Sequence, residues 1–461
     1  MSETLSRDIL DQSAAEMAQA LAGRSVGALE LTDAAIARIE ARDGPINAVV
    51  VRDFDRARTA AKAADTALAR GERGPLLGVP MTVKESHNVA GLPTTWGFPD
   101  AVGWTAPEDS VGVARLKAAG AVILGKTNIP VALADWQADN PVYGRTNNPW
   151  DLTRSPGGSS GGGAAALAAG MVPLEFGSDI GGSIRIPAAF CGVFGHKPSY
   201  QLIPQRGHAP PRTDGAPIVL GVVGPLARTA GDLQLALDVL AGPDEDAVGY
   251  RLALPAPRHA RLADYRVLIV DHHPLAGAQA QIREALDDLG NRLSGLGAKV
   301  SRKSELLPDL AVAQGIYGEL LMPAMSRGGP APTQTNAHHW MNLLDAQLMV
   351  RRRWAALFQS FDVVLAPAHG SVAFAHETEP DGDKRVLDLD GEATPYFAQS
   401  AWAGMATLAN LPATVAPIGL SRGGLPIGVQ IIGPYLEDRT TIAFAGLLER
   451  EFGGFRAPPA P

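Results

Sequence analysis

Two adjacent serines in a glycine-rich stretch are the first residues that could perform chemistry. Residues 155–170 read SPGGSSGGGAAALAAG and place Ser159 and Ser160 between pairs of glycines. Glycine lets the backbone approach a ligand closely, so a serine in such a loop can be presented to a substrate. Serine is also a preferred helix N-cap, and an alanine-rich run follows. This stretch alone therefore favours helix capping over catalysis.

A second serine follows two glycines further along the chain. Residues 173–192 read PLEFGSDIGGSIRIPAAFCG, which predicts a strand, a polar turn and a short helix. Ser183 comes directly after Gly181 and Gly182, so the backbone N–H groups from Ile180 to Ser183 could point at one spot. An oxyanion hole requires such a nest of donors. The alternative is that Ser183 only caps the helix.

Lys84 is the third candidate. It ends the apolar strand in residues 78–91, GVPMTVKESHNVAG. An isolated lysine at a strand end normally points to water. If it is buried beside hydroxyl groups, its pKa falls and the neutral amine can serve as a base.

Residues 120–127, GAVILGKT, match the phosphate-loop pattern G-x-x-x-x-G-K-[ST]. A phosphate loop follows its strand and opens a helix. Here the apolar strand lies inside the motif and Asn128-Ile129-Pro130 follow it, so we reject nucleotide binding.

The paired serines also match G-x-S-x-G, the nucleophile elbow of α/β-hydrolases. That elbow requires a preceding strand and a later acid and histidine. The preceding segment, NNPWDLTRSP, is a predicted loop. An α/β-hydrolase-type esterase stays open as an alternative, because histidines follow, including His272, His339, His369 and His376.

Helices and strands alternate around these segments. Helical spacing of apolar residues predicts helices over 14–23, 31–42, 55–71, 111–120, 278–297 and 437–452. Apolar runs predict strands over 76–84, 120–127, 265–272, 361–368, 412–418 and 425–434. Without a long linker or repeat, this alternation predicts one α/β domain with a sheet covered by helices.

Three segments together closely resemble the amidase signature family, in their order and in their spacing. They are GVPMTVKE with Lys84, the loop SPGGSSGG and the segment GSDIGGSIRIPAAFCGVFGHKP. The match covers roughly residues 70–230, and FDVVLAPA and LPIGVQIIGP extend it toward the C-terminus. The resemblance implies a large mixed β-sheet with helices on both faces, in a single domain over 1–461. Residues 70–230 would form its signature core, and 231–461 its substrate-pocket and C-terminal part.

The resemblance also implies a Ser–cisSer–Lys triad. Ser183 would be the nucleophile, Ser159 would follow a cis peptide bond and relay the proton, and Lys84 would be the base. Ser160 would brace the loop. The implied oxyanion-hole donors are the amides of Ile180, Gly181, Gly182 and Ser183.

In relatives, the segment VALADW lines the acyl pocket. Here it offers Leu133, Ala134 and Trp136, an apolar wall suited to aryl or alkyl groups, with Ser159 beside it as a further substrate contact. Three residues depart from the family's usual pattern, and we expect them to affect packing rather than chemistry: Gly163, Ser178 and His196.

The function expected from these residues is hydrolysis of aryl or alkyl carboxamides or anilides, with esters and carbamates (urethanes) as further candidates. The partners would be a small amide and water, with neither metal nor cofactor. An amidotransferase subunit that releases ammonia for a partner is the alternative, although residues 335–360 show no match to the glutamine-holding segment. A non-catalytic scaffold would not need the three triad residues.

Composition narrows the setting. The 461-residue chain has a formal net charge of −8 and 46% hydrophobic residues. Without clustered basic residues, nucleic acid is not an expected partner. The single cysteine, Cys191, excludes an internal disulfide and is expected to be a buried structural thiol. With neither a signal peptide nor a membrane span, we expect a cytoplasmic protein. A homodimer is also a candidate assembly.

Overall fold

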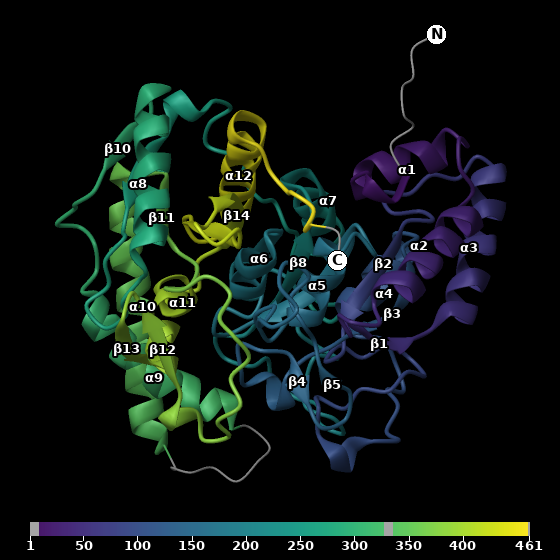
Figure 1. Cartoon of the computed structure of the whole chain (residues 1–461), viewed down its shortest axis with the longest axis horizontal. Helices are drawn as coiled ribbons and strands as arrows, with labels where there is room; N and C mark the ends of the chain where they lie inside the picture. The colour runs from purple at the N-terminus through teal and green to yellow at the C-terminus, as the bar shows by residue number, and fades with distance from the viewer. Residues whose placement is uncertain (1–8, 327–334, 460–461) are drawn as a thin grey trace.

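One mixed sheet of eleven strands runs through the molecule (Figure 1). The computed structural model describes residues 9–326 and 335–459. In sheet order, the strands are β1 (Val49–Arg52), β3 (Val122–Thr127), β2 (Pro80–Lys84), β6 (Leu174–Asp179), β8 (Val222–Ala227), β7 (Phe194–Lys197), β14 (Ala413–Leu420), β15 (Pro426–Ile432), β11 (Val363–Pro367), β9 (Arg266–Ile269) and β10 (Lys299–Ser301). Strands from both parts of the chain, 70–230 and 231–461, therefore join the same sheet.

Helices cover both faces of this sheet. Every residue of β2, β3, β6, β7, β8, β11 and β15 is buried. Because successive side chains of a strand point to opposite faces, complete burial requires cover on both. The described helices are α1 (Ala14–Ala22), α2 (Ala28–Arg42), α3 (Phe54–Ala69), α4 (Val111–Ala118), α5 (Gly161–Ala168), α6 (Arg185–Cys191), α7 (Ala230–Leu240), α8 (Ala280–Gly295), α9 (Leu310–Met325), α10 (Ala337–Ser360), α11 (Ser400–Thr407) and α12 (Asp438–Phe452).

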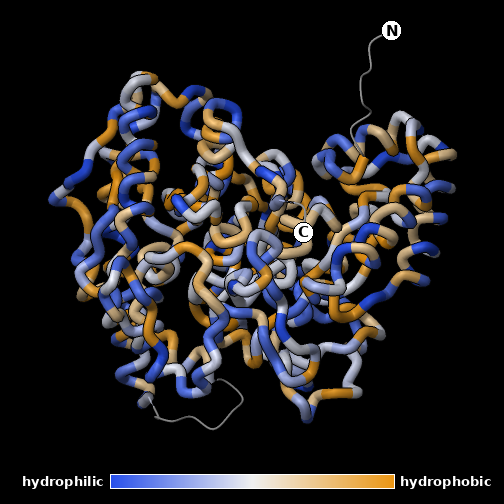
Figure 2. The backbone as a smooth tube through the Cα atoms, viewed as in Figure 1, coloured by the Kyte–Doolittle hydropathy of each residue, from blue (hydrophilic) through white to orange (hydrophobic). Residues whose placement is uncertain are grey.

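The peripheral helices are amphipathic. Figure 2 shows hydrophilic and hydrophobic residues alternating along them, the pattern of helices with one buried face. In α3 the residues that face the core are alanines and one leucine, at Ala57, Ala61, Ala64, Ala67 and Leu68. In the described ranges, no helix combines the length and the apolar character needed to cross a membrane.

The elements expected from periodicity are present. Each of the six expected helices corresponds to an observed one, α1, α2, α3, α4, α8 or α12, within a few residues at each end. β3 occupies the phosphate-loop pattern itself, and the Lys126 side chain is buried there with a hydrogen bond to Thr94 Oγ1 at 2.7 Å. The rejection of nucleotide binding at this motif is consistent with that burial.

Two parallel neighbouring strands position the candidate residues. β2 ends at Lys84 and β6 ends at Asp179, and the register pairs Val83 with Phe176. Because parallel strands carry their carboxyl ends at the same edge of a sheet, Lys84 and the turn that follows Asp179 meet there. α5 begins directly after the paired serines and packs on β2, β3, β6 and β8.

Candidate active site

Lys84 is buried and in contact with two serine hydroxyls. Its Nζ lies 2.6 Å from Ser159 Oγ and 2.9 Å from Ser178 Oγ. Burial lowers the pKa of Lys84 to about 7, although the carboxylates of Asp179 and Glu175 act in the opposite direction. Near pH 7, the Lys84 amine is therefore neutral in a large fraction of the protein molecules. The neutral amine can accept a proton from a hydroxyl.

The Ser159 loop passes close to another backbone segment. The peptide bond between Gly158 and Ser159 is cis, as the resemblance implies. A Cβ on Gly158 would overlap the backbone of Gln137, so only glycine fits there. Ser160 Oγ donates a hydrogen bond of 3.3 Å to the Ser178 carbonyl. Ser160 thus ties the loop to β6, the bracing role expected from the sequence.

Ser178 has a closer role than the sequence predicted. We expected this departure from the family pattern to affect packing only, but its hydroxyl contacts Lys84 Nζ directly. The expectation was wrong because Ser178 lies near the end of β6, beside the parallel strand that ends at Lys84. The other two departures do lie in packed surroundings. Gly163 packs against Glu175, and His196 is buried beside Thr414.

Asp179 organises the turn that leads to Ser183. Its carboxylate accepts hydrogen bonds from the amides of Gly182 at 2.9 Å and Ile184 at 3.0 Å. It also forms a fully buried ion pair of 2.8 Å with Arg185. Arg185, with Lys197, outweighs the effect of burial, and the pKa of Asp179 falls to about 2. The carboxylate is thus ionised at any pH where the enzyme would work.

Two side chains from distant segments hold the carbonyls of the same turn. Tyr317 of α9 donates its hydroxyl to the Ile180 carbonyl at 2.8 Å. Trp136 donates its indole N–H to the Gly181 carbonyl at 3.0 Å. These bonds fix the orientation of both peptide units, and so fix the direction in which the neighbouring N–H groups point.

The Gly182 amide is hydrogen-bonded within the protein, whereas it was expected to be an oxyanion-hole donor. Its N–H is used by Asp179 and is not available to a substrate oxygen. Within residues 9–326 and 335–459, no protein acceptor contacts the amides of Ile180, Gly181 or Ser183. Among the described residues, three of the four predicted donors are therefore not used by a protein acceptor.

Ser159, Ser178 and Ser183 line one cavity of about 50 Å³. We call it the catalytic cavity because two of the predicted catalytic residues, Ser159 and Ser183, line it. Ser183 is 5% exposed. Much of the remaining wall is apolar and comes from Trp96, Leu133, Ile180, Ile218, Val222 and Met325. The three predicted catalytic residues are therefore brought together, since Lys84 lies directly behind the serines.

The predicted acyl-pocket residues separate in the structure. Leu133 lines the catalytic cavity. Ala134 instead lines an open groove of about 490 Å³ together with Asp139 and Arg385. Trp136 lies behind the turn that leads to Ser183, which we call the oxyanion turn, and it packs against Tyr396 with 5.1 Å between ring centroids. Trp136 thus supports the turn, and Leu133 is the predicted residue that faces the cavity.

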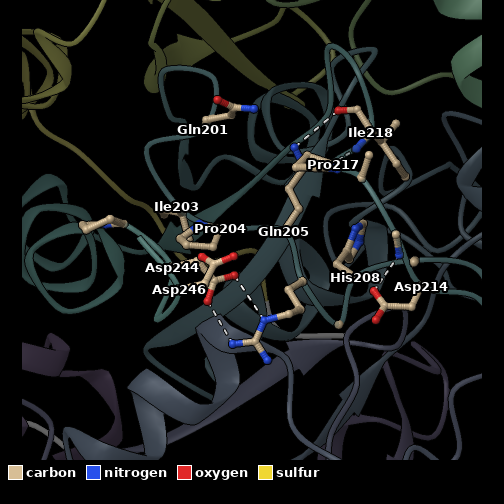
Figure 3. Close-up of a pocket in the computed structure, with 16 residues that line it drawn as sticks. Gln201, Ile203, Pro204, Gln205, His208, Asp214, Pro217, Ile218, Asp244 and Asp246 are labelled. Carbon is tan, nitrogen blue, oxygen red and sulfur yellow. Dashed lines mark hydrogen bonds and ion pairs between the residues drawn. The ribbon is translucent and has the colours of Figure 1, made fainter. Parts of the chain in front are cut away.

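A larger cavity of about 350 Å³ adjoins the catalytic one (Figure 3). The two share Gln205, His208 and Ile218. Gln205 holds the shared wall by donating to the Gly221 carbonyl at 2.6 Å. The outer cavity also carries three aspartates, and Asp244 is ion-paired with Arg206 at 2.9 Å.

Most of the side chains that the alternative mechanisms would use lie outside the catalytic cavity. Cys191 is buried, and burial raises the pKa of its thiol, which makes it a poor nucleophile. Four of the histidines that follow the paired serines do not line the catalytic cavity: His272, His339, His369 and His376. His208 does line it, and its Nε2 lies 3.0 Å from Ser86 Oγ. In the described part of the chain, no group of three or more His, Cys, Asp or Glu side chains is arranged to hold a metal ion.

Sequence reasoning did not identify the side chains that shape the turn. Asp179 and Arg185 lie inside the segment that suggested the oxyanion hole, and their spacing around Ser183 was an available signal. Tyr317 is 137 positions from its partner Ile180. No local pattern connects those two residues.

Comparison with known proteins identifies related chains. The sequence profile of the family described as Amidase matches residues 30–326 and 309–442. A glutamyl-tRNA(Gln) amidotransferase subunit of Anaeromyxobacter dehalogenans (strain 2CP-C) is 34% identical, over 97% of this chain and 97% of that protein. The putative amidase AmiB2 of Mycobacterium bovis (strain ATCC BAA-935 / AF2122/97) is also 34% identical, over 96% of both chains.

A solved structure agrees in fold. The crystal structure of a bacterial aryl acylamidase of the amidase signature family superposes with a TM-score of 0.79 at 26% identity. It covers 95% of this chain and 96% of its own. The similarity thus extends over nearly the whole chain.

Proposed function

The chain belongs to the amidase signature family of enzymes, and we propose that it hydrolyses carboxamides through an acyl-enzyme formed on Ser183. The contact that carries this proposal is the 2.6 Å hydrogen bond between Lys84 Nζ and Ser159 Oγ, in a cavity that Ser183 also lines. A serine hydroxyl is a weak nucleophile until a base removes its proton, and neutral Lys84 is that base.

In the proposed acylation step, Ser183 Oγ attacks the carbonyl carbon of the amide. The Ser183 proton passes to Ser159, whose own proton passes to Lys84. The resulting ammonium then returns a proton, through Ser159, to the nitrogen of the leaving amine. Without that protonation, the amine would be a poor leaving group.

The negative oxygen of the tetrahedral intermediate would bind the amides of Ile180, Gly181 and Ser183. These donors need no reorganisation during the reaction, because Tyr317 and Trp136 already hold the carbonyls of the turn. Water then attacks the acyl carbon and gives up a proton to Lys84 through Ser159. The same relay returns that proton to Ser183 Oγ as the bond to the acyl group breaks and the acid leaves. Every proton in the cycle is transferred by Lys84 and Ser159, so the scheme requires neither metal nor cofactor.

The wall of the catalytic cavity supports an uncharged substrate. Among the described residues that line it, Asp179 is the only acidic one and no lysine or arginine is present. The charge of Asp179 is balanced by Arg185. A substrate carboxylate would therefore enter without a cationic partner, at a large desolvation cost. We infer that aryl or alkyl amides and anilides are the preferred substrates.

The adjoining cavity extends the substrate-binding region. The catalytic cavity is about 50 Å³, whereas the outer one is about 350 Å³ and offers more room for a group attached to the amide. We propose that a group attached to the amide extends past the shared residues Gln205, His208 and Ile218 into the outer cavity. Esters and carbamates have the same carbonyl geometry, and we include them as candidate substrates.

An amidotransferase subunit is the second candidate function. The 34% identity to the glutamyl-tRNA(Gln) amidotransferase chain, over 97% of both proteins, favours it. Against it, residues 335–360 contain the whole of α10, whose buried face includes Val350 and Trp354, and none of them lines the catalytic cavity. Copurification with a partner, and ammonia release that depends on that partner, would favour this candidate over the stand-alone enzyme.

A substrate panel tests the proposal. Purified enzyme is assayed with neutral chromogenic anilides, with isosteric anilides that carry an acyl-side carboxylate, and with matched esters and carbamates. We expect turnover of the neutral anilides, and a kcat/KM lower by at least a hundredfold for the anionic ones. Glutaminase activity without anilide turnover would instead support the amidotransferase. Sedimentation of the same preparation tests the predicted homodimer.

A further inference from the structure

A carboxyl group that the proposed mechanism does not use lies buried beside the base. Glu175 of β6 has 0% exposure. The hydroxyls of Thr82 and Thr127 donate to its two oxygens at 2.5 Å and 2.7 Å. In the described part of the chain, no lysine, arginine or histidine forms an ion pair with it. A buried carboxylate without a cationic partner is costly, which suggests a role beyond packing.

The strand register places this carboxyl close to Lys84. Thr82 is the register partner of Glu175 and lies two residues before Lys84, on the same face of β2. Thr127 is the register partner of Lys84 on the other side. From α5, Gly163 packs against the carboxyl, since a Cβ there would lie 2.5 Å from Glu175 Cγ. The acid and the base thus share one enclosed patch of the sheet.

These two groups change charge in the same pH range. Burial raises the pKa of Glu175 to about 7 and lowers that of Lys84 to about 7. Asp179, the other acid beside the base, stays ionised because of Arg185. Each of the paired groups favours the charged form of the other.

The other titratable groups around the base leave this pairing intact. Burial lowers the pKa of His208 to about 3 and that of His87 well below its usual range, so both stay neutral. Lys126 lies beside Glu85, and burial lowers its pKa to about 8. Burial also lowers the pKa of Lys197 to about 7, but its charged neighbours are Arg185, Asp179 and Asp438.

We propose that Glu175 is a positioning residue that sets the pH range over which Lys84 acts as the base. When Glu175 is ionised, its charge retains the proton on Lys84, and when Glu175 is neutral, the lysine loses that proton more readily. This role rests on the proposed function and adds the regulation of its base. Glu175 acts through Lys84 and does not touch the substrate.

Glu175→Gln tests the role. Glutamine keeps the shape of the side chain and can hydrogen-bond both threonine hydroxyls, but it carries no charge. The acidic limb of kcat/KM should therefore move to lower pH by about one unit, while the alkaline plateau stays within about threefold. The rate at which phenylmethanesulfonyl fluoride modifies Ser183 should show the same shift, independently of turnover.

Asp232→Asn is the matched control. Asp232 is also a buried carboxyl, hydrogen-bonded to the amides of Ala14 and Ala15 at 2.9 Å and 3.0 Å, outside the site. Its neutralisation should lower Tm and leave the acidic limb in place. If Glu175→Gln also lowers Tm without moving the limb, or moves it to higher pH, the proposal is wrong.

Thr127 provides a second pair of variants if Glu175→Gln does not fold. Thr127→Val removes a donor to the ionised carboxylate, which favours neutral Glu175, and should move the limb in the same direction by a smaller amount. Thr127→Ser keeps the hydroxyl and should keep the wild-type limb. If kcat/KM falls at the same acidic pH in Thr127→Val and Thr127→Ser, the proposal is wrong. Failure of the proposed function is separate, because it appears as turnover retained by Ser183→Ala.

Discussion

Lys84 and Ser159 are 75 positions apart in the chain, yet their Nζ and Oγ atoms lie 2.6 Å apart. This contact joins the end of a buried strand to a glycine-rich loop. It provides a route by which a serine hydroxyl can lose its proton to an amine.

The pH dependence reports the base. Lys84 acts only as the neutral amine, and burial lowers its pKa to about 7. Activity should therefore be lost as the pH falls through about 7, and should reach a plateau above about 8. Initial rates of anilide hydrolysis between pH 5 and 10 measure this limb.

Variants at the base and at the histidines complete that test. Lys84→Ala should abolish amide turnover, and with it the increase in activity as the pH rises through about 7. Single alanine variants of His272, His339, His369 and His376 should preserve both. An inactive histidine variant together with an active Lys84→Ala would instead favour the α/β-hydrolase alternative.

Ser183→Ala should leave the fold intact and lower kcat by up to ~10⁶-fold, because no other group replaces the nucleophile. Mass spectrometry after a fluorophosphonate probe should find the adduct on Ser183. In Ser160→Ala the probe should still label Ser183, since Ser160 braces the loop and does not react. Turnover above a few per cent in a clean Ser183→Ala preparation contradicts the assignment.

Chelators and thiol reagents should leave initial rates nearly unchanged. The proposed cycle moves its protons through Lys84 and Ser159, and Cys191 is buried with a raised thiol pKa. Rates measured after incubation with EDTA, and separately with iodoacetamide, test this. Reversible loss on chelation that added zinc restores would point to a metallohydrolase.

Tyr317→Phe should separate positioning from binding. It removes the hydroxyl that donates to the Ile180 carbonyl at 2.8 Å. The orphaned carbonyl should reduce the free energy of unfolding by about 1–3 kcal/mol. The loosened turn should lower kcat by about tenfold with a smaller change in KM. An unchanged kcat at the same loss of stability would mean that the bond supports only the fold.

Local patterns predicted most of the helices and strands, whereas the family resemblance named Lys84, Ser159 and Ser183, which the structure brings to one site. Lys84 ends a continuous apolar run, and Ser183 follows two glycines. The loss of the Gly182 amide to Asp179 could not be read from the same segment, since the pattern of donors does not state which of them the protein itself uses. Nor could the positions of Trp136 and Glu175, whose roles depend on long-range register and packing.

Tyr317 belongs to a part of the chain that is synthesised long after the three catalytic residues. A nascent chain that has emerged only as far as α7 (Ala230–Leu240) contains the nucleophile, the relay and the base, but not the hydroxyl that holds Ile180 in place. The turn of such a chain lacks one of the two side-chain bonds to its carbonyls. Hydrolytic capacity should therefore arise late in biosynthesis, when α9 docks, and incomplete translation products should be poor catalysts.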